Sequence, residues 1–473
     1  MGFIHHDRKT HMHIVMFSMT PLFANRSMGG AQKQLKKIAL SLAEQGHRVT
    51  LLCTRRDDTR EPFQWHEKAQ VVPIYDFKQP FPEPYDVPPY LVAQAIQDTA
   101  QYLAQADVFY NHDGGLIFPY IYQDIPTVIS LRSVRFSETI QSGFLFQGDA
   151  LILPSEHTAN VWRHTAGRFF PEMTQRIEVI HNGLDFSVYK PTDPTELAAR
   201  IGVDPQQHTI VLYPHRPEAN KGIYQAISLA AKLVNDHGIK TLRLLIPRWI
   251  DAGLSAEVRA FYDSLMEAIQ LEGITENVIF HDWISDDDMP AYYSLGGVTL
   301  AIGNYVETFG NTPYESLACG TPVIAARVAA YRDMLPAEYL VDYDDVPFAS
   351  AERAAYLLKA RARTSAVALE WLHTNFSQDD MVRRYADVIL NARKLPPLAY
   401  RPQLFNDETL FELAPWCYVS ASGAVYHDFR GQYISTAADL TLFQRLPVTL
   451  KDGLPGQVDA LYRAGSLVPL TTL

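Results

Sequence analysis

Short apolar runs alternate with amphipathic segments along most of the chain, and this alternation constrains the fold more than any other feature. The first series starts at residue 13, where "HIVMFSM" is followed by "QKQLKKIALSLAEQGHRVTLLC". Within that stretch the spacing of Leu35, Ile38 and Leu42 indicates one helical face, and Gly46 can end the helix. The runs "ADVFYN", "PTVISL", "DALILP" and "RIEVIHN" follow. Such units predict a parallel sheet covered on both faces, in a domain that ends near residue 190.

A second series repeats the pattern with the runs "HTIVLYP", "LRLLIP", "VIFHDW" and "VTLAIGN". Helices near residues 346 to 393 are expected to close this second sheet. The chain has 473 residues, too many for one core, since a domain takes roughly 150 residues. We therefore expect doubly wound α/β domains over residues 12–188 and 189–395, and a small α+β extension over 397–473.

The stretch "VVPIYDFKQPFPEPYDVPP" interrupts the first series. Proline lacks the backbone donor that a central strand needs, and it restricts the residue before it. The sequence predicts a long loop here.

Composition and charge exclude several classes of protein. No run approaches the ~20 apolar residues of a membrane span. The net charge of -12 opposes binding to nucleic acid or to an anionic bilayer. The three cysteines are too few and too scattered for a disulfide framework or a zinc site. We expect a protein of the reducing cytoplasm with no transmembrane segment.

The first residues, "MGFIHHDRKTHMHIVMF", have no apolar core of a signal peptide. They contain four histidines, which on a terminal segment are more typical of a leader than of a metal site. No bound metal is expected. The four are His5, His6, His11 and His13.

The stretch "ETFGNTPYESLACG", residues 307–320, contains two glutamates in a setting suited to ligand binding. Glu307 follows the run "VTLAIGN", at the sheet edge where doubly wound folds bind ligands. Thr312 can cap a helix and Glu315 can complete a capping box, a structural role that by itself explains Glu315. Gly310 allows close backbone approach, and the helix start favours an anion.

Carboxylates suit sugar hydroxyls, and a charged acceptor contributes roughly 1.5 to 3 kcal/mol per hydrogen bond. The loop "HRPEANKG" supplies two cations for a diphosphate, Arg216 and Lys221. Either cation alone is more often an ordinary surface residue. Two cations and two carboxylates at strand ends of one sheet favour a site for a sugar linked to a diphosphate.

The glutamate motif within "HDWISDDDMPAYYSL…ETFGNTPYESLACGTPVIA" resembles that of the retaining GT-B glycosyltransferases in the sucrose-synthase and glycogen-synthase clan, which are family 4-like. "MGGAQKQLKKIALSLAEQGHRVTLL" and "IEVIHNGLDFSVYKP" resemble their first glycine loop and their interdomain junction. The resemblance covers residues 12 to about 393.

The resemblance implies a GT-B fold, in which two Rossmann-like domains face a cleft. It also implies transfer of a hexosyl group from a nucleoside-diphosphate sugar to an acceptor hydroxyl. Configuration would be retained, with neither metal nor another cofactor. The acceptor, whether small molecule, glycan or peptide, stays open, as do the base, the donor sugar and the oligomeric state.

The resemblance also assigns roles to individual residues. Glu307, Arg216 and Lys221 would act on the donor sugar and its diphosphate, and Glu315 would hold the ribose. The other expected contacts are Thr308 and the backbone of Phe309, Gly310, Asn311 and Thr312 around the sugar and phosphates, the backbone near Trp283 and Ile284 at the base, and Gly29 and Gly30 at the phosphates from the first domain.

Two departures from the family pattern are evident. Family members commonly place a histidine after the strand corresponding to "PTVISL", where this chain has Arg132. His112 in "YNHDGG" could substitute as a catalytic group, although a lone histidine is more often simply hydrogen-bonded in a loop. Ala329 and Ala330 stand where the family often has a glycine pair.

Three alternative interpretations stay open. Asp342 and Asp344 form an Asp-x-Asp pair like that of metal-dependent transferases, but such acids after a strand are more often loop or cap residues. A nucleotide-sugar 2-epimerase of related fold would need no acceptor. A non-catalytic sugar-nucleotide-binding protein would bind without turnover.

The C-terminal extension, residues 397–473, which we call the tail, lacks the alternation of apolar runs and helices seen in the rest of the chain. "CYVSA" and "AVYHDF" flank Ser422-Gly423 as a predicted hairpin, and "TAADLTLFQRL" and "PGQVDALYRAG" predict short helices. A winged-helix module would suit this pattern. It faintly resembles leader-peptide-binding domains, which would make the acceptor a peptide, but the favoured interpretation is an extension that packs on the transferase or forms an oligomer contact.

Overall fold

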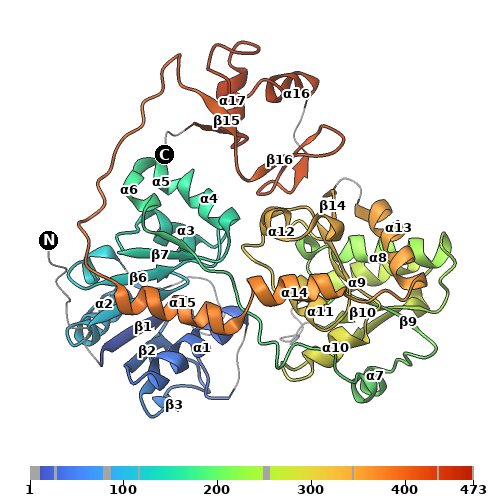
Figure 1. Cartoon of the computed structure of the whole chain (residues 1–473), viewed down its shortest axis with the longest axis horizontal. Coiled ribbons are helices and arrows are strands. Elements are labelled where there is room, and N and C mark those ends of the chain that lie inside the picture. Colours follow the sequence, from blue (N-terminus) through green and yellow to red (C-terminus); the bar gives the residue numbers. More distant parts are fainter. Residues whose placement is uncertain are drawn as a thin grey trace. The chain divides into compact units, whose positions relative to one another are not determined.

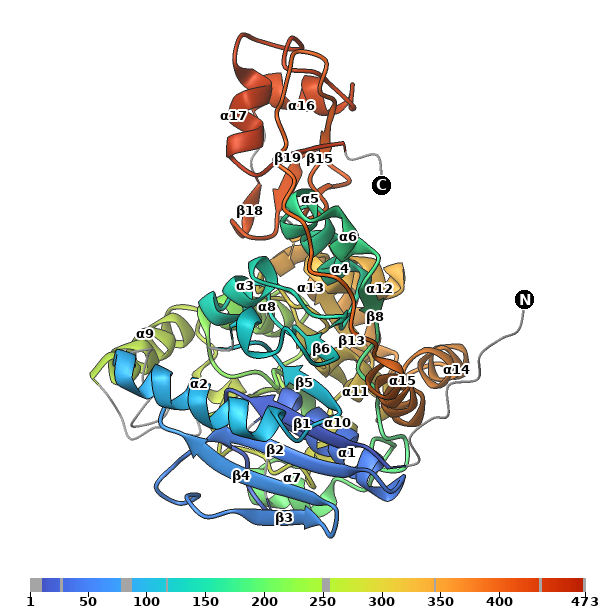
Figure 2. The ribbon, with the colours of Figure 1, turned by 90° about the vertical axis from the view of Figure 1, so that its left-hand side faces the viewer.

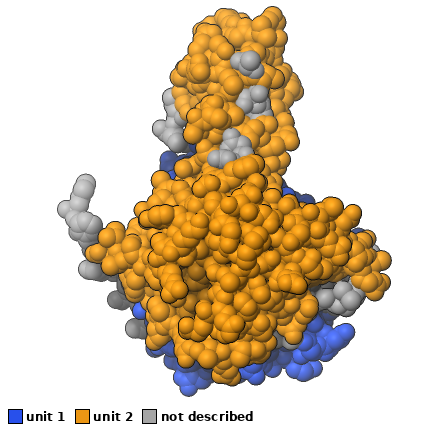
Figure 3. Space-filling model, turned by 90° about the vertical axis from the view of Figure 1, so that its right-hand side faces the viewer, with its two compact units in different colours: residues 1–182, 379–405, 471–473 blue, residues 183–378, 406–470 orange. Residues whose placement is uncertain are grey.

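The computed structural model describes residues 11–25, 29–77, 87–115, 118–248, 256–343, 346–433 and 436–470. It divides into two compact units (Figure 3). The first contains residues 1–182, 379–405 and 471–473, and the second contains residues 183–378 and 406–470. None of the helices in the described part of the chain combines the length and the hydropathy that crossing a bilayer requires.

The first unit is built on an eight-stranded sheet in the order β3-β4-β2-β1-β5-β6-β7-β8 (Figure 2). All neighbouring strands are parallel except β3 and β4. This confirms the predicted parallel sheet. The strands are β1 (His13–Ser18), β2 (Arg48–Thr54), β3 (Phe63–His66), β4 (Ala69–Tyr75), β5 (Val108–His112), β6 (Thr127–Ser130), β7 (Ala150–Leu153) and β8 (Ile177–Val179).

The proline-rich stretch differs from the prediction, because its first residues belong to β4 and are not loop. Pro73 pairs in register with Cys53 of β2. On the other side of β4, the neighbour β3 pairs only with Ala69, Gln70 and Val71. A proline is tolerated there because that part of β4 has a strand on one side only. Residues 78–86 lie outside the described residues.

The helices of the first unit bury the apolar faces that the sequence indicated. Leu35, Ile38 and Leu42 of α1 have no exposed surface. The helices are α1 (Gly30–Glu44), α2 (Pro89–Leu103), α3 (Ser137–Phe144), α4 (Glu156–Arg163), α5 (Ala166–Phe169), α6 (Pro171–Thr174) and α15 (Gln378–Asn391).

Helix α15 joins the core of the first unit, although the sequence order suggested that it closes the second sheet. Its residues Met381, Tyr385 and Ile389 lie in the same apolar cluster as Leu35 of α1. Their spacing shows an amphipathic helix. Periodicity gives the buried face of a helix but not the core that receives it.

The second unit contains a six-stranded parallel sheet in the order β11-β10-β9-β12-β13-β14. Numbered from its first strand, this order is 3-2-1-4-5-6, with its topological switch point between β9 and β12. The doubly wound prediction is therefore confirmed here as well. The strands are β9 (Thr209–Leu212), β10 (Leu242–Pro247), β11 (Val278–His281), β12 (Val298–Ala301), β13 (Val323–Ala326) and β14 (Leu340–Val341).

Helices cover this sheet, and α8 and α13 pack side by side (Figure 1). Buried residues such as Leu229 and Ala354 join them to the strands in one apolar cluster. The helices are α7 (Thr195–Ile201), α8 (Ile223–Asn235), α9 (Ala256–Leu271), α10 (Met289–Leu295), α11 (Thr312–Ala318), α12 (Ala329–Met334), α13 (Val346–Lys359) and α14 (Ala366–Asn375).

The tail contains the predicted hairpin and both predicted helices, but it is not a separate body. Tyr418 and Tyr426 are buried in the apolar cluster of the second sheet, so residues 406–470 belong to the second unit. The remainder of the predicted extension, residues 397–405, belongs to the first unit. The elements are β15 (Phe411–Leu413), β16 (Cys417–Val419), β17 (Val425–His427), β18 (Gln432–Tyr433), α16 (Ala437–Phe443), α17 (Gln457–Arg463) and β19 (Leu467–Pro469).

Candidate active site

The loops that follow β9 and β12 meet at the switch point of the second sheet and bring Lys221 against Glu307. The Lys221 Nζ lies 2.5 Å from Glu307 Oε1, and the two side chains are 16% and 18% exposed. The ammonium group also lies 3.7 Å from the centroid of the Tyr305 ring. A partly buried cation and a carboxylate therefore share the position where this fold binds ligands.

Two glycines allow these loops to approach each other. Gly222 has a φ of 85°, and a Cβ there would lie 2.7 Å from the backbone nitrogen of Gly303. A Cβ on Gly303 would lie 2.4 Å from the carbonyl oxygen of Asn220. Larger residues would push the loops apart and separate Lys221 from Glu307.

Residues of both loops line a small hollow. Its volume is about 10 Å³, which is about the space of one water. A sugar could therefore enter only if side chains around the hollow moved. The lining residues are His215, Asn220, Lys221, Ala301, Gly303, Tyr305, Glu307 and Tyr331.

His215 is a site residue that the sequence reasoning missed. Its Nε2 lies 3.1 Å from the carbonyl oxygen of Leu300, to which it must donate, because a carbonyl only accepts. Burial, with the positive charge of Lys221, lowers the pKa of His215 to about 3. The ring is therefore neutral at pH 7. Its position directly before Arg216 was the only signal in the sequence.

Glu315 does not form the predicted capping box. Helix α11 has Asn311 as its N-cap and no capping bond from a side chain, so Glu315 lies at the fourth helical position instead of the third. Its Oε2 accepts a hydrogen bond of 2.9 Å from the Tyr293 hydroxyl. Burial raises the pKa of Tyr189, and the charge of Glu315 and a hydrogen bond to it raise it further. Tyrosine hydroxyls therefore surround this carboxylate.

The loop between the two glutamates packs on α12. Gly310 has a φ of 74°, and a Cβ there would lie 2.4 Å from the Tyr331 hydroxyl. The Ala330 amide donates to the Glu307 carbonyl at 3.2 Å. Phe309 is 2% exposed and its ring packs on that of Tyr314, so its side chain is part of the apolar core. Thr308, Asn311 and Thr312 are partly buried.

Arg216 lies beside the site without lining the small hollow. Its side chain is 52% exposed, and its Nε lies 3.3 Å from a carboxylate oxygen of Glu218. The planar guanidinium of Arg216 offers a fork of donors that suits phosphate oxygens.

The residues predicted to meet the base lie at another hollow of the second unit. Trp283 is 42% exposed and Ile284 is 8% exposed. The hollow has a volume of about 20 Å³, which is room for about one water, so a base could enter only if side chains moved or could stack on the exposed face of Trp283. Its lining residues are Pro214, Pro247, His281, Trp283, Ile284, Met289 and Tyr292.

The remaining predicted residues belong to the first unit. Gly29 is extended and precedes Gly30, the first residue of α1. His112 ends β5 and is 3% exposed. Its Nε2 lies 2.9 Å from the carbonyl oxygen of Ala31, and its Nδ1 lies 2.7 Å from the Tyr110 hydroxyl. Burial and the charge of Arg132 lower the pKa of His112 to about 3, so the ring is neutral and both nitrogens are occupied.

Arg132 follows β6 and is held by two side chains of the same unit. Its guanidinium donates to the Tyr385 hydroxyl at 3.1 Å and to the side-chain oxygen of Asn182. Its backbone amide donates to Asp113 at 2.8 Å.

Asp113 is a second residue that the sequence reasoning missed. Its φ of 70° is rare for a residue with a Cβ, and burial raises the pKa of its carboxyl group to about 6. A partly buried acid with this backbone conformation at the carboxyl end of a strand is typical of a functional position. The Asp-Gly-Gly sequence directly after a strand was the available signal.

Of the acid pair Asp342 and Asp344, the structure describes only Asp342. Asp342 pairs with Arg327 at 2.8 Å and accepts from the Ala421 amide at 3.1 Å, and Asp344 lies outside the described residues. The described residues contain no cluster of three or more His, Cys, Asp or Glu side chains that could hold a metal ion.

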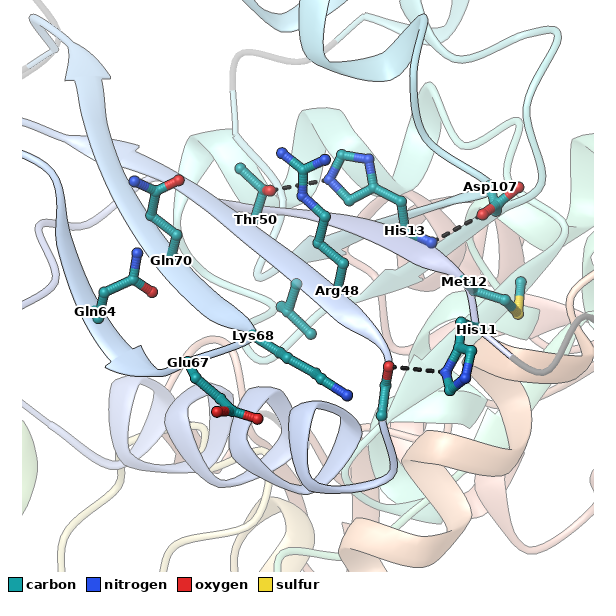
Figure 4. A pocket seen from close by; sticks show the side chains of 12 residues that line it. His11, Met12, His13, Arg48, Thr50, Gln64, Glu67, Lys68, Gln70 and Asp107 are labelled. Carbon is teal, nitrogen blue, oxygen red and sulfur yellow. Dashed lines mark hydrogen bonds between the residues drawn. The ribbon is translucent and has the colours of Figure 1, made fainter.

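A third hollow, of about 600 Å³, lies in the first unit at the amino ends of its strands (Figure 4). His13 begins β1, and its Nε2 lies 2.9 Å from the Thr50 hydroxyl of β2. The His13 amide donates to Asp107 at 2.8 Å. His11 also lines this hollow, whereas His5 and His6 lie outside the described residues. The predicted site residues follow the opposite, carboxyl ends of the strands.

Two family models match the chain in succession. The model described as Glycosyltransferase Family 4 matches residues 28–188, and the model described as Glycosyl transferases group 1 matches residues 195–363. The chain belongs to the GT-B glycosyltransferases of the family 4-like type.

Curated relatives and solved structures agree with this membership. The D-inositol 3-phosphate glycosyltransferase of Rhodococcus jostii is 33% identical over 153 residues, which is 32% of this chain and 32% of the relative. The enzyme of the same name from Mycobacterium sp. is 33% identical over 175 residues, 36% of this chain and 37% of the relative. The matched region thus spans about a third of the length of these relatives.

Sucrose-phosphate synthase from Thermosynechococcus elongatus is similar in structure, with a TM-score of 0.64 and 19% identity over 80% of this chain and 98% of that one. The Anabaena protein HepE in complex with UDP-glucose has a TM-score of 0.58 and 17% identity, over 80% of this chain and 99% of that one. At these identities the likeness confirms the GT-B fold.

Proposed function

We propose that this protein transfers a hexosyl group from a nucleoside-diphosphate sugar to an acceptor hydroxyl, with retention of configuration and without a metal ion. The observation that carries the proposal is the 2.5 Å contact between Lys221 and Glu307 at the switch point of the second sheet. A carboxylate there can accept a hydrogen bond from a sugar hydroxyl, and an ammonium group can bind a phosphate oxygen. The two groups match the two halves of such a donor.

The reaction breaks the bond between the anomeric carbon and the terminal phosphate oxygen. Negative charge grows on that oxygen and positive charge on the carbon. Lys221 and the half-exposed Arg216 stabilise the leaving diphosphate, which is the role that a metal ion would otherwise fill. The acceptor oxygen forms the new bond on the face that the diphosphate leaves, and its proton passes to a phosphate oxygen. The products are a glycoside and a nucleoside diphosphate.

Other groups of the second unit would orient the nucleotide. The Tyr293 hydroxyl donates to the Glu315 carboxylate and orients it. The carboxylate can then accept hydrogen bonds from the vicinal hydroxyls of a ribose. The half-exposed Trp283 ring offers a surface on which a base can stack.

The relatives guide the choice of substrates. Since one solved neighbour was crystallised with UDP-glucose and curated relatives carry the name D-inositol 3-phosphate glycosyltransferase, UDP-sugars and phosphorylated polyols are the first to try. The three cysteines of the chain, Cys53, Cys319 and Cys417, are free and buried, which suits the reducing cytoplasm that we propose as its location.

The test begins with thermal shift of the full chain against UDP-, ADP- and GDP-sugars. A ligand at fifty times its dissociation constant adds roughly 2.3 kcal/mol to stability, which shifts the melting temperature measurably. The bound donor is then incubated with acceptors, with and without EDTA, and the anomeric configuration of the product is read by NMR. Transfer with retention that EDTA leaves intact is expected. Conversion of the donor alone to another nucleotide sugar would indicate the epimerase, and binding without turnover on any acceptor would indicate a sensor.

A further inference from the structure

Asp428 of the tail has a fully buried carboxylate that contacts α12, the helix on which the loop of the candidate active site packs. Asp428 directly follows β17, and its side chain has no exposed surface. Its Oδ1 accepts from the Ala329 amide at 3.1 Å and from Arg332 Nη1 at 3.2 Å. Its Oδ2 accepts from Arg332 Nη2 at 3.1 Å. Both oxygens of Asp428 are thus bonded to α12.

Arg332 is fixed from several sides. It also donates to the carbonyl oxygen of Pro415 at 3.1 Å, and its guanidinium lies 5.1 Å from the centroid of the Tyr418 ring. Its side chain is 11% exposed. A carboxylate buried as deeply as Asp428 is stable only with such charged and hydrogen-bonded partners, so removing one partner leaves the other unsatisfied.

Ala329, which Asp428 contacts, is held in an unfavourable conformation. Its φ is 45°, in the left-handed region where a Cβ is disfavoured, and it has no exposed surface. A glycine would adopt this conformation without strain. The hydrogen bond from its amide to Asp428 is therefore a contact that opposes relaxation of Ala329.

Residues directly after Ala329 support the site loop. The Ala330 amide donates to the Glu307 carbonyl at 3.2 Å. The next side chain, Tyr331, fills the space beside Gly310 and lines the hollow that contains Lys221. A change in the backbone at Ala329 is thus transmitted through two contacts to the loop that carries Glu307.

The tail makes a second contact, next to Tyr305 of the hollow's lining. The Asn304 side-chain amide donates to the carbonyl oxygen of Gly431 at 3.3 Å. Asn304 immediately precedes Tyr305, whose ring lies under the Lys221 ammonium group. Contacts from the turn after β17 therefore reach Glu307 through Ala329 and Ala330, and Lys221 through Asn304 and Tyr305.

We infer that Asp428 is a positioning residue of the donor site, which keeps Ala329 in its left-handed conformation and thereby fixes the loop of Glu307. Residues 406–470 are then a working part of the donor half. For the effect on substrate, this inference rests on the proposed function. It differs from a purely structural attachment of the tail, which would not depend on the conformation of Ala329.

The test compares the full-length wild type with Asp428→Asn, Ala329→Gly and the double variant. Hydrogen exchange of peptides from residues 305–334 is measured without ligand, and affinity is measured for UDP, ADP and GDP. In Asp428→Asn we expect exchange in that segment to be about tenfold faster, and the tightest of the three nucleotides to bind about tenfold more weakly. In the double variant, the glycine introduced by Ala329→Gly adopts the left-handed conformation without help, so at least about threefold of each loss should be recovered.

Asp452→Asn is the matched control, because Asp452 forms an ion pair of 3.0 Å with Arg445 within the tail. It should leave exchange of residues 305–334 and nucleotide affinity unchanged. If Asp428→Asn does not fold, Arg332→Lys takes its place, since lysine keeps the charge but loses the planar fork. The same recovery by Ala329→Gly is then expected.

Wild-type exchange in the folded Asp428 or Arg332 variant would overturn the inference. So would an equal loss with and without the Ala329→Gly substitution, because the tail would then be a structural attachment. The exchange measurement needs no ligand, so it decides the inference even if the wild type binds none of the three nucleotides. That last result would count against the proposed function.

Discussion

The ammonium group of Lys221 and the carboxylate of Glu307 touch across the switch point of the second sheet, at 2.5 Å, although 86 positions separate them in sequence. The order 3-2-1-4-5-6 explains this contact. It makes β9 and β12 neighbours, so the loops that follow them leave the sheet side by side. A donor bound at this position would replace the contact between Lys221 and Glu307 with its own contacts to these two side chains.

Substitution of either partner should therefore impair transfer. Glu307→Gln and Lys221→Ala are each expected to lower kcat/KM by at least about tenfold, or roughly 1.4 kcal/mol in the activation barrier. Initial rates with the donor found by thermal shift provide the measurement. Glu352→Gln, at a carboxylate that is 80% exposed, should change nothing. Unaltered rates in both site variants would remove Glu307 and Lys221 from the chemistry.

Gly310 is expected to tolerate no side chain. Gly310→Ala combines a left-handed φ with a Cβ 2.4 Å from the Tyr331 hydroxyl, so it should disturb the loop of Glu307 and weaken nucleotide binding about tenfold or more. Gly202→Ala separates the two causes, because Gly202 has a φ of 84° and open space around it. That control should cost stability alone, on the order of 1 kcal/mol. Equal affinity in the two variants would show that contact with Tyr331 is unimportant.

Trp283 should contribute through its ring. Trp283→Ala is expected to weaken binding of UDP about three- to tenfold, consistent with roughly 0.5 to 1.5 kcal/mol for a pair of stacked rings. Calorimetry should give the same factor for uridine as for UDP, since the ring contacts the base and not the phosphates. Leu271→Ala, at an apolar side chain that is 82% exposed, is the control. A loss confined to UDP would place Trp283 at the diphosphate instead.

His215 should make stability depend on pH. Its pKa is about 3 in the folded protein, lowered by burial and by Lys221, and 6.5 is its ordinary value. Between these values only the unfolded chain binds the proton, so the free energy of unfolding falls as the pH drops below 6.5. The slope is up to about 1.4 kcal/mol per pH unit. Above pH 6.5 this group has no such effect.

Denaturant unfolding at pH 5 and pH 7 measures this dependence. His215→Asn, whose side-chain amide can still donate to Leu300, should lose less stability at pH 5 than the wild type does. His373→Asn, at an exposed histidine, should behave like the wild type. The same pH dependence in the wild type and in His215→Asn would contradict a neutral His215.

Local patterns in the sequence predicted the parts of the structure that depend on neighbouring residues. Apolar alternation predicted both parallel sheets, and the position of Glu307 after a strand predicted its place at the carboxyl edge. The capping box was wrong by one residue, because Asn311, and not Thr312, precedes the helix. Both residues are good caps, so composition could not distinguish them.

The remaining differences concern partners that are distant in sequence. The pairing of Pro73 depends on where β3 begins, and the core that receives Tyr385 depends on where the chain returns. Asp428 and Arg332 are 96 positions apart, and the residues next to each in the sequence do not indicate that the two form an ion pair. Contacts of this kind depend on tertiary packing, so the pattern of a short stretch of one sequence cannot predict them.

The place of α15 in the first unit has a consequence for synthesis on the ribosome. All eight strands of that unit have been translated once residue 179 is made, yet Tyr385 and Ile389, which complete its core, follow only after the second sheet has been translated. Until α15 is made, the nascent first unit exposes the apolar surface that α15 later covers, and chaperones bind such surfaces. For the same reason, a truncated chain that ends at residue 182 should be insoluble. A chimera in which residues 183–378 are replaced by another sequence, with α15 retained, should keep the core of the first unit intact.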